Sequence, residues 1–228
     1  MTDHSTSVGR GVLWMLGGVL SFSLMAVSGR EAGQVIPTAE LLVWRSVIGA
    51  AIVSLVIAGS ARGFSQVATR RLRQHLVRNV FHFFGQYCWY YAVLLIPLAQ
   101  LFALEFTSPI WVMLMAPLFL GERFTRWKAG AVVLGFAGVL LIVRPEALSL
   151  GEGQIWGLMA AVGFAVSMIA TKRLSTSESS LCVVFYMTVM QAPMGLLLSG
   201  GLPTVPPNLY IAFWIVCLSV GGLSAHFC

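Results

Sequence analysis

Charged side chains are scarce in this chain of 228 residues: they make up 10% of the sequence, whereas soluble domains carry about 25%. Hydrophobic residues make up 58%. A chain of this composition has too few charges to cover a water-exposed surface. The composition therefore excludes an ordinary soluble domain and favours an all-α polytopic membrane protein.

Cysteine pairs and catalytic motifs are also missing. Four cysteines occur in apolar stretches without CxxC spacing, at Cys88, Cys182, Cys217 and Cys228. The sequence therefore predicts neither a disulfide framework nor a metal site, and it indicates no cofactor. The Gly-x-Ser-x-Gly, His-Glu-x-x-His, P-loop and GxGxxG motifs are absent as well, so hydrolase and phosphate-binding functions have no support.

Long apolar runs account for most of the sequence. A helix that spans a membrane needs about 20 mostly apolar residues. Eight segments meet or approach this length, namely 11–29, 38–58, 78–96, 97–120, 127–143, 153–171, 181–199 and 209–228. Short polar stretches separate most of them, and we expect a tight turn at Pro97, between the third and the fourth.

Lysine and arginine indicate the orientation, because they concentrate on the cytoplasmic side of membrane proteins. With the N-terminus inside, Arg30 and Arg144 fall outside and Arg45 falls within a span. The other basic residues then all face the cytoplasm, namely Arg10, Arg62, Arg70, Arg71, Arg73, Arg78, Arg123, Arg126, Lys128, Lys172 and Arg173. We therefore expect both termini in the cytoplasm. The net charge of +6 then faces anionic lipid head groups, so it indicates no nucleic-acid partner.

The two halves of the chain align when the sequence is shifted by 142 residues, which places Trp14 over Trp156 and Phe22 over Phe164. A first unit of five helices starts inside, so the second unit must start outside, as an inverted copy. Inverted repeats are the recurrent plan of secondary transporters, whose substrate site lies near the midplane between the repeats. The shift therefore favours a transporter.

The stretch 97–145 resembles the EamA-like transporters of the drug/metabolite transporter superfamily. The resemblance is carried by Pro97, Ala103, Thr107-Ser108-Pro109, Pro117, Leu120-Gly121-Glu122, Gly130, Gly135-Phe136-Ala137-Gly138-Val139 and Arg144-Pro145. It implies ten helices in two inverted five-helix repeats, here 1–147 and a partial second repeat of three helices at 148–228. We thus expect about eight of ten spans, with an incomplete second repeat and a chain truncated after the eighth helix.

The resemblance also implies a function. We expect a secondary transporter, and specifically an exporter, that moves a small metabolite or drug-like molecule across the bacterial inner membrane by alternating access. The expected partners are this small molecule and the membrane lipids, with a homo-oligomer or complementing helices in addition. Two alternatives stay open: a non-transporting fragment or assembly subunit, and a membrane-embedded enzyme that uses Glu105 or His226.

Ionisable residues within the spans mark the candidate substrate or coupling site. Arg45 in the second span and Glu105 in the fourth lie at matching depth. Because a single charge inside a bilayer is costly, we expect the two side chains to pair. The pair is either a static salt bridge or a functional one, in which Glu105 titrates or Arg45 binds an anionic group of the substrate.

Polar and proline residues near this depth complete the candidate site. Gln86 and Tyr90 lie four residues apart and share one helix face, where they either line a cavity or bond to other helices. Pro109 and Pro117 interrupt the fourth span and free backbone carbonyls, which is tolerated beside other helices or a water-lined cavity. We expect a kink or hinge at these two prolines.

Overall fold

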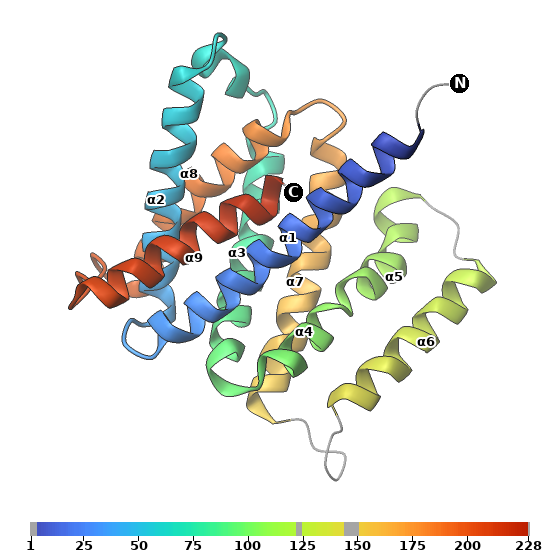
Figure 1. The fold of residues 1–228 in the computed structure, drawn as a ribbon. Coiled ribbons are helices and arrows are strands. Elements are labelled where there is room, and N and C mark those ends of the chain that lie inside the picture. Colours follow the sequence, from blue (N-terminus) through green and yellow to red (C-terminus); the bar gives the residue numbers. More distant parts are fainter. Residues whose placement is uncertain (1–3, 122–124, 144–150, 228) are drawn as a thin grey trace.

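The computed structural model describes residues 4–121, 125–143 and 151–227. Within them it contains nine α-helices and one 3-10 helix, namely α1 (His4–Gly33), α2 (Thr38–Gly59), η1 (Gly63–Val67), α3 (Leu72–Leu95), α4 (Leu98–Glu105), α5 (Ser108–Leu120), α6 (Arg126–Val143), α7 (Glu152–Leu174), α8 (Ser180–Ser199) and α9 (Leu209–Phe227) (Figure 1).

The helices have the length and composition of membrane spans. Six segments of the described chain are long and apolar enough to cross a bilayer, namely Gly11–Gly33, Thr38–Gly59, Leu98–Phe119, Glu152–Leu174, Ser180–Ser199 and Leu209–Phe227. The outer surface is correspondingly apolar, with Leu118 83% and Leu197 84% exposed. Such a surface suits lipid rather than water. The predicted all-α polytopic membrane protein is confirmed.

The predicted span 97–120 is divided into α4 and α5. The break falls after Glu105, where the hydroxyl of Thr107 donates to the carbonyl of Leu104 over 2.6 Å. Pro109 lies in the first turn of α5, where its missing N–H leaves no helical bond unmade. Helix α5 continues through Pro117. The interruption is therefore found just before the first proline, and a hinge role for either proline stays a prediction.

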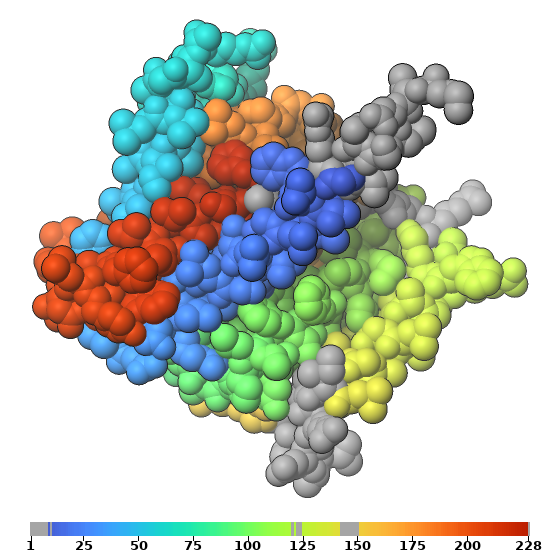
Figure 2. All heavy atoms as spheres, in the orientation of Figure 1, coloured from blue at the N-terminus to red at the C-terminus, as the bar shows by residue number. Residues whose placement is uncertain are grey.

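The helices pack in three main pairs: α3 against α7, α1 against α9, and α2 against α8. If the chain is an inverted repeat, α7, α8 and α9 are the counterparts of α1, α2 and α3. The first helix of each unit then packs on the third helix of the other, and the two second helices pack on each other. A two-fold axis between the units produces this reciprocity, which supports the predicted repeat. Figures 1 and 2 show α1 and α9 side by side across one face.

The backbones of α3 and α7 approach closely at two glycines. A Cβ atom on Gly163 would lie 3.0 Å from the Cα of Gly85. Small residues at such crossings allow membrane helices to pack without intervening side chains. This crossing holds the inward face of α3 against the second half of the chain, which positions the site described below.

One end of the bundle carries most of the described basic residues, and we call it the basic end; they are Arg62, Arg70, Arg71, Arg73, Arg126, Lys128, Lys172 and Arg173. There the connection between α2 and α3 meets the connection between α7 and α8, because Thr69 donates to a carboxylate oxygen of Glu178 over 2.6 Å. The side chain of Arg173 also donates to the carbonyl of Phe119 at the end of α5. At the opposite end, Arg30 donates to the carbonyl of Val93 in the last turn of α3.

Candidate functional site

Helix α3 carries a continuous polar face directed into the bundle. Its members His75, Arg78, His82, Gln86 and Tyr90 follow one another at intervals of three or four residues, so they lie on one side of the helix. Each is 6% exposed or less. A polar face of this length in a membrane helix is costly unless its groups find partners.

Arg45 of α2 meets this face near its middle, and it is 4% exposed. The amide oxygen of Gln86 accepts from Nη1 of Arg45 over 2.6 Å and from Nη2 of Arg45 over 3.1 Å. This orientation of the amide matches donors with acceptors, and it lets the Gln86 nitrogen donate to Oε1 of Gln191 over 2.8 Å. Gln86 therefore joins α2 to α8 through α3.

The hydrogen bonds continue from Gln191 toward the basic end. Its Nε2 lies 3.0 Å from Nδ1 of His82 and donates to Oδ1 of Asn79 over 3.5 Å. Arg78 donates to the same Asn79 oxygen over 2.9 Å and to the hydroxyl of Thr171, on α7, over 3.2 Å. We call this connected set the polar network; its members are Arg45, Arg78, Asn79, His82, Gln86, Thr171 and Gln191.

The polar network contains two buried cations without an acidic partner. Within the described part of the chain, neither Arg45 nor Arg78 forms an ion pair; their bonds go to amides and a hydroxyl. The Nε of Arg45 makes no hydrogen bond at all. Because a guanidinium stays charged in a protein and a buried lone charge is expensive, the network has an excess positive charge that an anion would neutralise.

The predicted ion pair between Arg45 and Glu105 is wrong. Among the described residues no ion pair joins them, and Glu105 instead accepts a hydrogen bond of 2.7 Å from the indole of Trp89. The neighbouring Tyr90 interacts electrostatically with both charges, and its hydroxyl is buried without a hydrogen-bond partner. Depth along a helix fixes the height of a side chain but leaves its rotation open, and Trp89 of α3 occupies the place where the arginine was expected.

Helix α9 provides space beside Arg45. A Cβ atom on Gly222 would lie 2.8 Å from Nε and 2.9 Å from Nη2 of Arg45, so the guanidinium lies against the backbone of α9. One turn further on, the ring of His226 lies 5.1 Å from the ring of His82, centroid to centroid. The absence of a side chain at Gly222 is therefore a condition for the observed position of Arg45.

A cavity of about 370 Å³ lies between α1, α2, α8 and α9, on the basic-end side of Arg45. Val53, Leu223 and Ser224 belong to its lining, which is mostly apolar. Leu223 follows Gly222 in the chain, so the cavity adjoins the part of α9 that covers Arg45. A small molecule that entered here would meet the guanidinium once α9 moved away from it.

The structure thus brings together Arg45, Gln86 and Tyr90, whereas Glu105 bonds to Trp89 and does not join them. The sequence analysis did not identify five members of the network as site residues, namely Arg78, Asn79, His82, Thr171 and Gln191. Arg78 and His82 were signalled by the regular polar spacing along 75–90, but the sequence analysis assigned Arg78 to the cytoplasmic face, whereas the structure buries it in the bundle. Gln191 carried no such signal.

Comparison with known proteins identifies the family. The profile of the EamA-like transporter family matches residues 9–144, more than half of the chain. The chain is 32% identical to the pseudopaline exporter CntI of Pseudomonas aeruginosa, over 94% of this chain and 74% of the relative. It is 28% identical to a riboflavin transporter of Rhizobium johnstonii, over 95% of this chain and 72% of the relative.

Further similarities agree with these. An S-adenosylmethionine uptake transporter of Rickettsia conorii is 24% identical and aligns over 100% of this chain and 76% of its own length. A solved crystal structure, 22% identical, covers 95% of this chain and 77% of that chain with a TM-score of 0.64, which supports the fold. The family and these relatives are transporters, so a membrane-embedded enzyme is excluded.

Proposed function

Because the chain belongs to the EamA-like transporter family, we propose that it exports a small metabolite with an anionic group across the bacterial inner membrane by alternating access. That the chain is a small-molecule transporter follows from its family and relatives. Outward direction is supported by the likeness to an exporter, although other relatives are named for uptake. The anionic class of the substrate is supported by the polar network.

The observation that carries the proposal is the pair of buried guanidinium groups, Arg45 and Arg78, without acidic partners among the described residues. A planar guanidinium binds a carboxylate or phosphate through two parallel hydrogen bonds. Arg45 has an unused donor at Nε, beside Nη2. The Nε and Nη2 atoms form one edge of the Arg45 guanidinium. An anionic substrate group at this edge would satisfy the unused Nε donor and neutralise one of the two buried charges.

Access to this edge depends on α9. Gly222 lies against the Nε and Nη2 side of Arg45, so this edge is covered in the present arrangement. In an inverted-repeat carrier the two units move against each other around the site. A small displacement of α9 from α2 would uncover the edge from the adjoining cavity, which lies on the basic-end side of Arg45. The excess of basic residues at that end supports a cytoplasmic location, with both termini inside.

Glu105 is the proposed coupling residue. It is a carboxylate within a span, it is held by the indole of Trp89, and Tyr90 links it electrostatically to Arg45. Intramembrane carboxylates commonly serve as proton carriers in transporters. Protonation of Glu105 would change the field at Arg45 and so the affinity for an anion, which would couple proton movement to transport.

The proposal is tested by reconstituting the purified protein in liposomes and measuring exchange of labelled metabolites. The panel contains amino acids, dicarboxylates, neutral metabolites and organic cations of similar size. We expect saturable flux that depends on the protein and is restricted to members with an anionic group. Export is then tested in everted vesicles with an imposed proton gradient. Flux restricted to cations or to uncharged molecules would contradict the proposed substrate class.

A further inference from the structure

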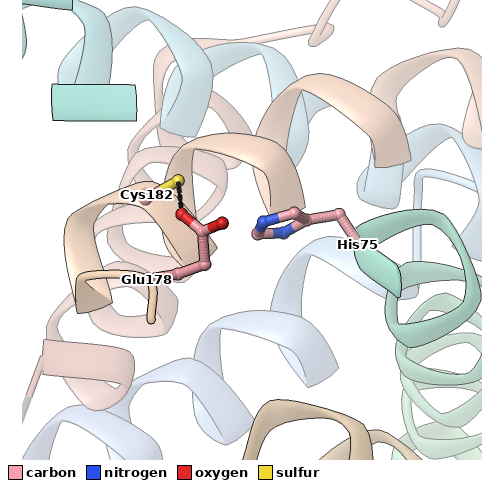
Figure 3. Close-up of side chains that lie close together, drawn as sticks. All are labelled: His75, Glu178 and Cys182. Atoms are coloured by element: carbon pink, nitrogen blue, oxygen red, sulfur yellow. Dashed lines mark hydrogen bonds between the residues drawn. The ribbon is translucent and has the colours of Figure 1, made fainter. Parts of the chain in front are cut away.

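Three potential metal ligands meet at the basic end, outside the polar network. His75 lies in the first turn of α3, Glu178 precedes α8, and Cys182 lies in the first turn of α8. One ligand atom from each residue lies within 4.8 Å of the others. Figure 3 shows the ring of His75 beside the carboxylate of Glu178, which is joined to the sulfur of Cys182. From this geometry we propose that His75, Glu178 and Cys182 bind Zn²⁺.

The spacing of the ligand atoms is close to what zinc requires. With Zn–S near 2.3 Å and Zn–N or Zn–O near 2.0–2.2 Å, tetrahedral ligand atoms stand about 3.3–3.7 Å apart. The sulfur of Cys182 already lies 3.2 Å from Oε2 of Glu178. The histidine ring has to approach by about 1 Å, a change within the reach of side-chain rotation at the start of a helix. Three protein ligands leave the fourth position for water.

Local structure fixes two of these ligands before any ion binds. The hydroxyl of Ser179 accepts from the backbone N–H of Cys182 over 3.2 Å and so caps the start of α8. This cap holds Glu178 and Cys182 on the same side of the first turn. Thr69 donates to Oε1 of Glu178 over 2.6 Å, which leaves Oε2 directed at the sulfur. Hydrogen bonds of this kind orient the ligands of metal sites.

The histidine supplies a second, independent observation. His75 is 0% exposed, and neither ring nitrogen has a hydrogen-bond partner. Its ring lies against that of Tyr186, with centroids 4.5 Å apart, and it is therefore held in place by packing. A buried imidazole without partners is costly. A metal ion would satisfy one of its two nitrogens.

Charge and ligand type favour zinc among the common cations. A thiolate and a carboxylate together neutralise a divalent ion, which suits a site that is largely out of water. Arg71 lies near Glu178 and Arg78 lies near His75, and their charges oppose a cation unless both anionic ligands are ionised. Sulfur with imidazole selects Zn²⁺ over the oxygen-preferring Mg²⁺ and Ca²⁺.

The site would connect the two halves of the chain. His75 begins the third helix of the first unit, whereas Cys182 begins the second helix of the other. Bound Zn²⁺ would therefore link α3 to α8 at the basic end and oppose their separation. This site could not be predicted from the sequence, because its histidine and its cysteine are far apart along the chain.

The test uses purified protein from which any affinity tag has been removed, treated with a chelator under reducing conditions. Co²⁺ is titrated as a spectroscopic substitute for Zn²⁺, since a thiolate ligand produces a charge-transfer band in the near ultraviolet. We expect the band to appear, Zn²⁺ to displace it, and about one Zn²⁺ per chain to be retained, with a raised melting temperature.

Matched variants assign the ligands. Cys182→Ser should abolish the charge-transfer band, and His75→Ala should weaken Zn²⁺ binding about tenfold or more. Thr69→Val, which removes only the bond that orients Glu178, should weaken it about 10-fold. Cys217→Ser is the control and should bind as the wild type does. No band in the wild type, or an unchanged band in Cys182→Ser, would overturn the site and leave adventitious binding only.

A measurement on the wild type covers the case in which a variant fails to fold. Bound Zn²⁺ should slow alkylation of Cys182 about tenfold or more while Cys217 reacts at an unchanged rate, as followed by peptide mass spectrometry. Equal rates at Cys182 with and without Zn²⁺ would contradict the proposal. Neither experiment depends on transport, so the zinc site and the proposed export can fail separately.

Discussion

Helices α3 and α9 hold corresponding places in the packing, since each lies against the first helix of the other half of the chain. Their inward faces nevertheless differ. The buried face of α3 includes Arg78, His82 and Gln86, whereas that of α9 is made of aliphatic residues, Ser219 and two adjacent glycines. Two helices in corresponding places of the packing therefore differ sharply in polarity, and α3 carries most of the buried polar groups.

The difference between the two faces indicates that α3 and α9 have different roles in transport. A face that is held by many directional hydrogen bonds resists sliding, because moving it leaves buried polar groups unsatisfied. A face of glycine and aliphatic side chains has no such bonds to break. We therefore expect α3 to carry the fixed part of the binding site and α9 to be the surface that moves over Arg45.

The largest expected effect is that of removing the buried positive charge of Arg45, in the part of the site that we expect to stay fixed. Arg45→Met should lower the affinity for an anionic substrate by about 3 kcal/mol, or more than roughly 100-fold in flux at low substrate. The melting temperature should stay equal or rise, because a buried cation without an acidic partner is removed. Arg45→Lys keeps the positive charge but loses the planar guanidinium that can donate two parallel hydrogen bonds, so it should retain part of the flux. A large fall in the melting temperature of Arg45→Met would indicate a structural role instead.

A smaller effect is expected from adding a side-chain atom on α9, the helix that we expect to move over Arg45. Gly222→Ala places a methyl group 2.8 Å from Nε of Arg45, so either the guanidinium or α9 must shift. Overpacking of this kind costs about 1–3 kcal/mol. We expect the Michaelis constant to rise about tenfold with little loss of expression. Gly201→Ala is the control, since a Cβ there meets nothing within 4 Å. Equal kinetics in the two variants would place α9 outside the site.

Glu105 lies outside the polar network, so its effect should be restricted to coupling. Glu105→Gln keeps an oxygen that accepts from Trp89, and stability should change by less than about 0.5 kcal/mol. Exchange without a proton gradient should continue, whereas accumulation driven by the gradient should be lost. Unchanged pH dependence of transport in this variant would leave Glu105 with a structural role only.

The smallest effect concerns stability alone and compares the two faces directly. Gln191→Leu removes the partner of Gln86 and His82, and we expect a loss of about 1 kcal/mol in the free energy of unfolding. Ser219→Ala on α9 removes a hydroxyl that bonds only to the carbonyl of Ile215 in its own helix, so the change should be near zero. Equal losses in thermal unfolding would remove the contrast between the two faces.

The positions of most helices were predicted from the sequence, although six segments of the described chain, not eight, are long and apolar enough to span a membrane. Long apolar runs and proline mark helix limits directly, and the segments 38–58 and 181–199 agree with α2 and α8 to within about two residues. The division between α4 and α5 was signalled by Pro109, although the break itself falls at Thr107. These features depend on local sequence, which is why they could be read from it.

The contacts of the site depended on helix rotation and on distant segments, and they were predicted less well. Arg45 and Gln86 were recognised because polar residues in apolar runs are conspicuous. The pairing of Arg45 with Glu105 failed because Glu105 accepts a hydrogen bond from Trp89 instead, a partner that no spacing along one helix reveals. The approach of His75 to Cys182 joins two connections that meet only in the folded bundle.

The most direct test of the account compares one transported metabolite in two forms, the carboxylate and its uncharged carboxamide, as competitors of labelled substrate in liposomes. The account predicts that the carboxylate competes about 100-fold better in the wild type and that this preference disappears in Arg45→Met. Equal competition by the two forms in the wild type, or a preference that survives in Arg45→Met, would contradict the claim that this buried guanidinium recognises an anionic substrate.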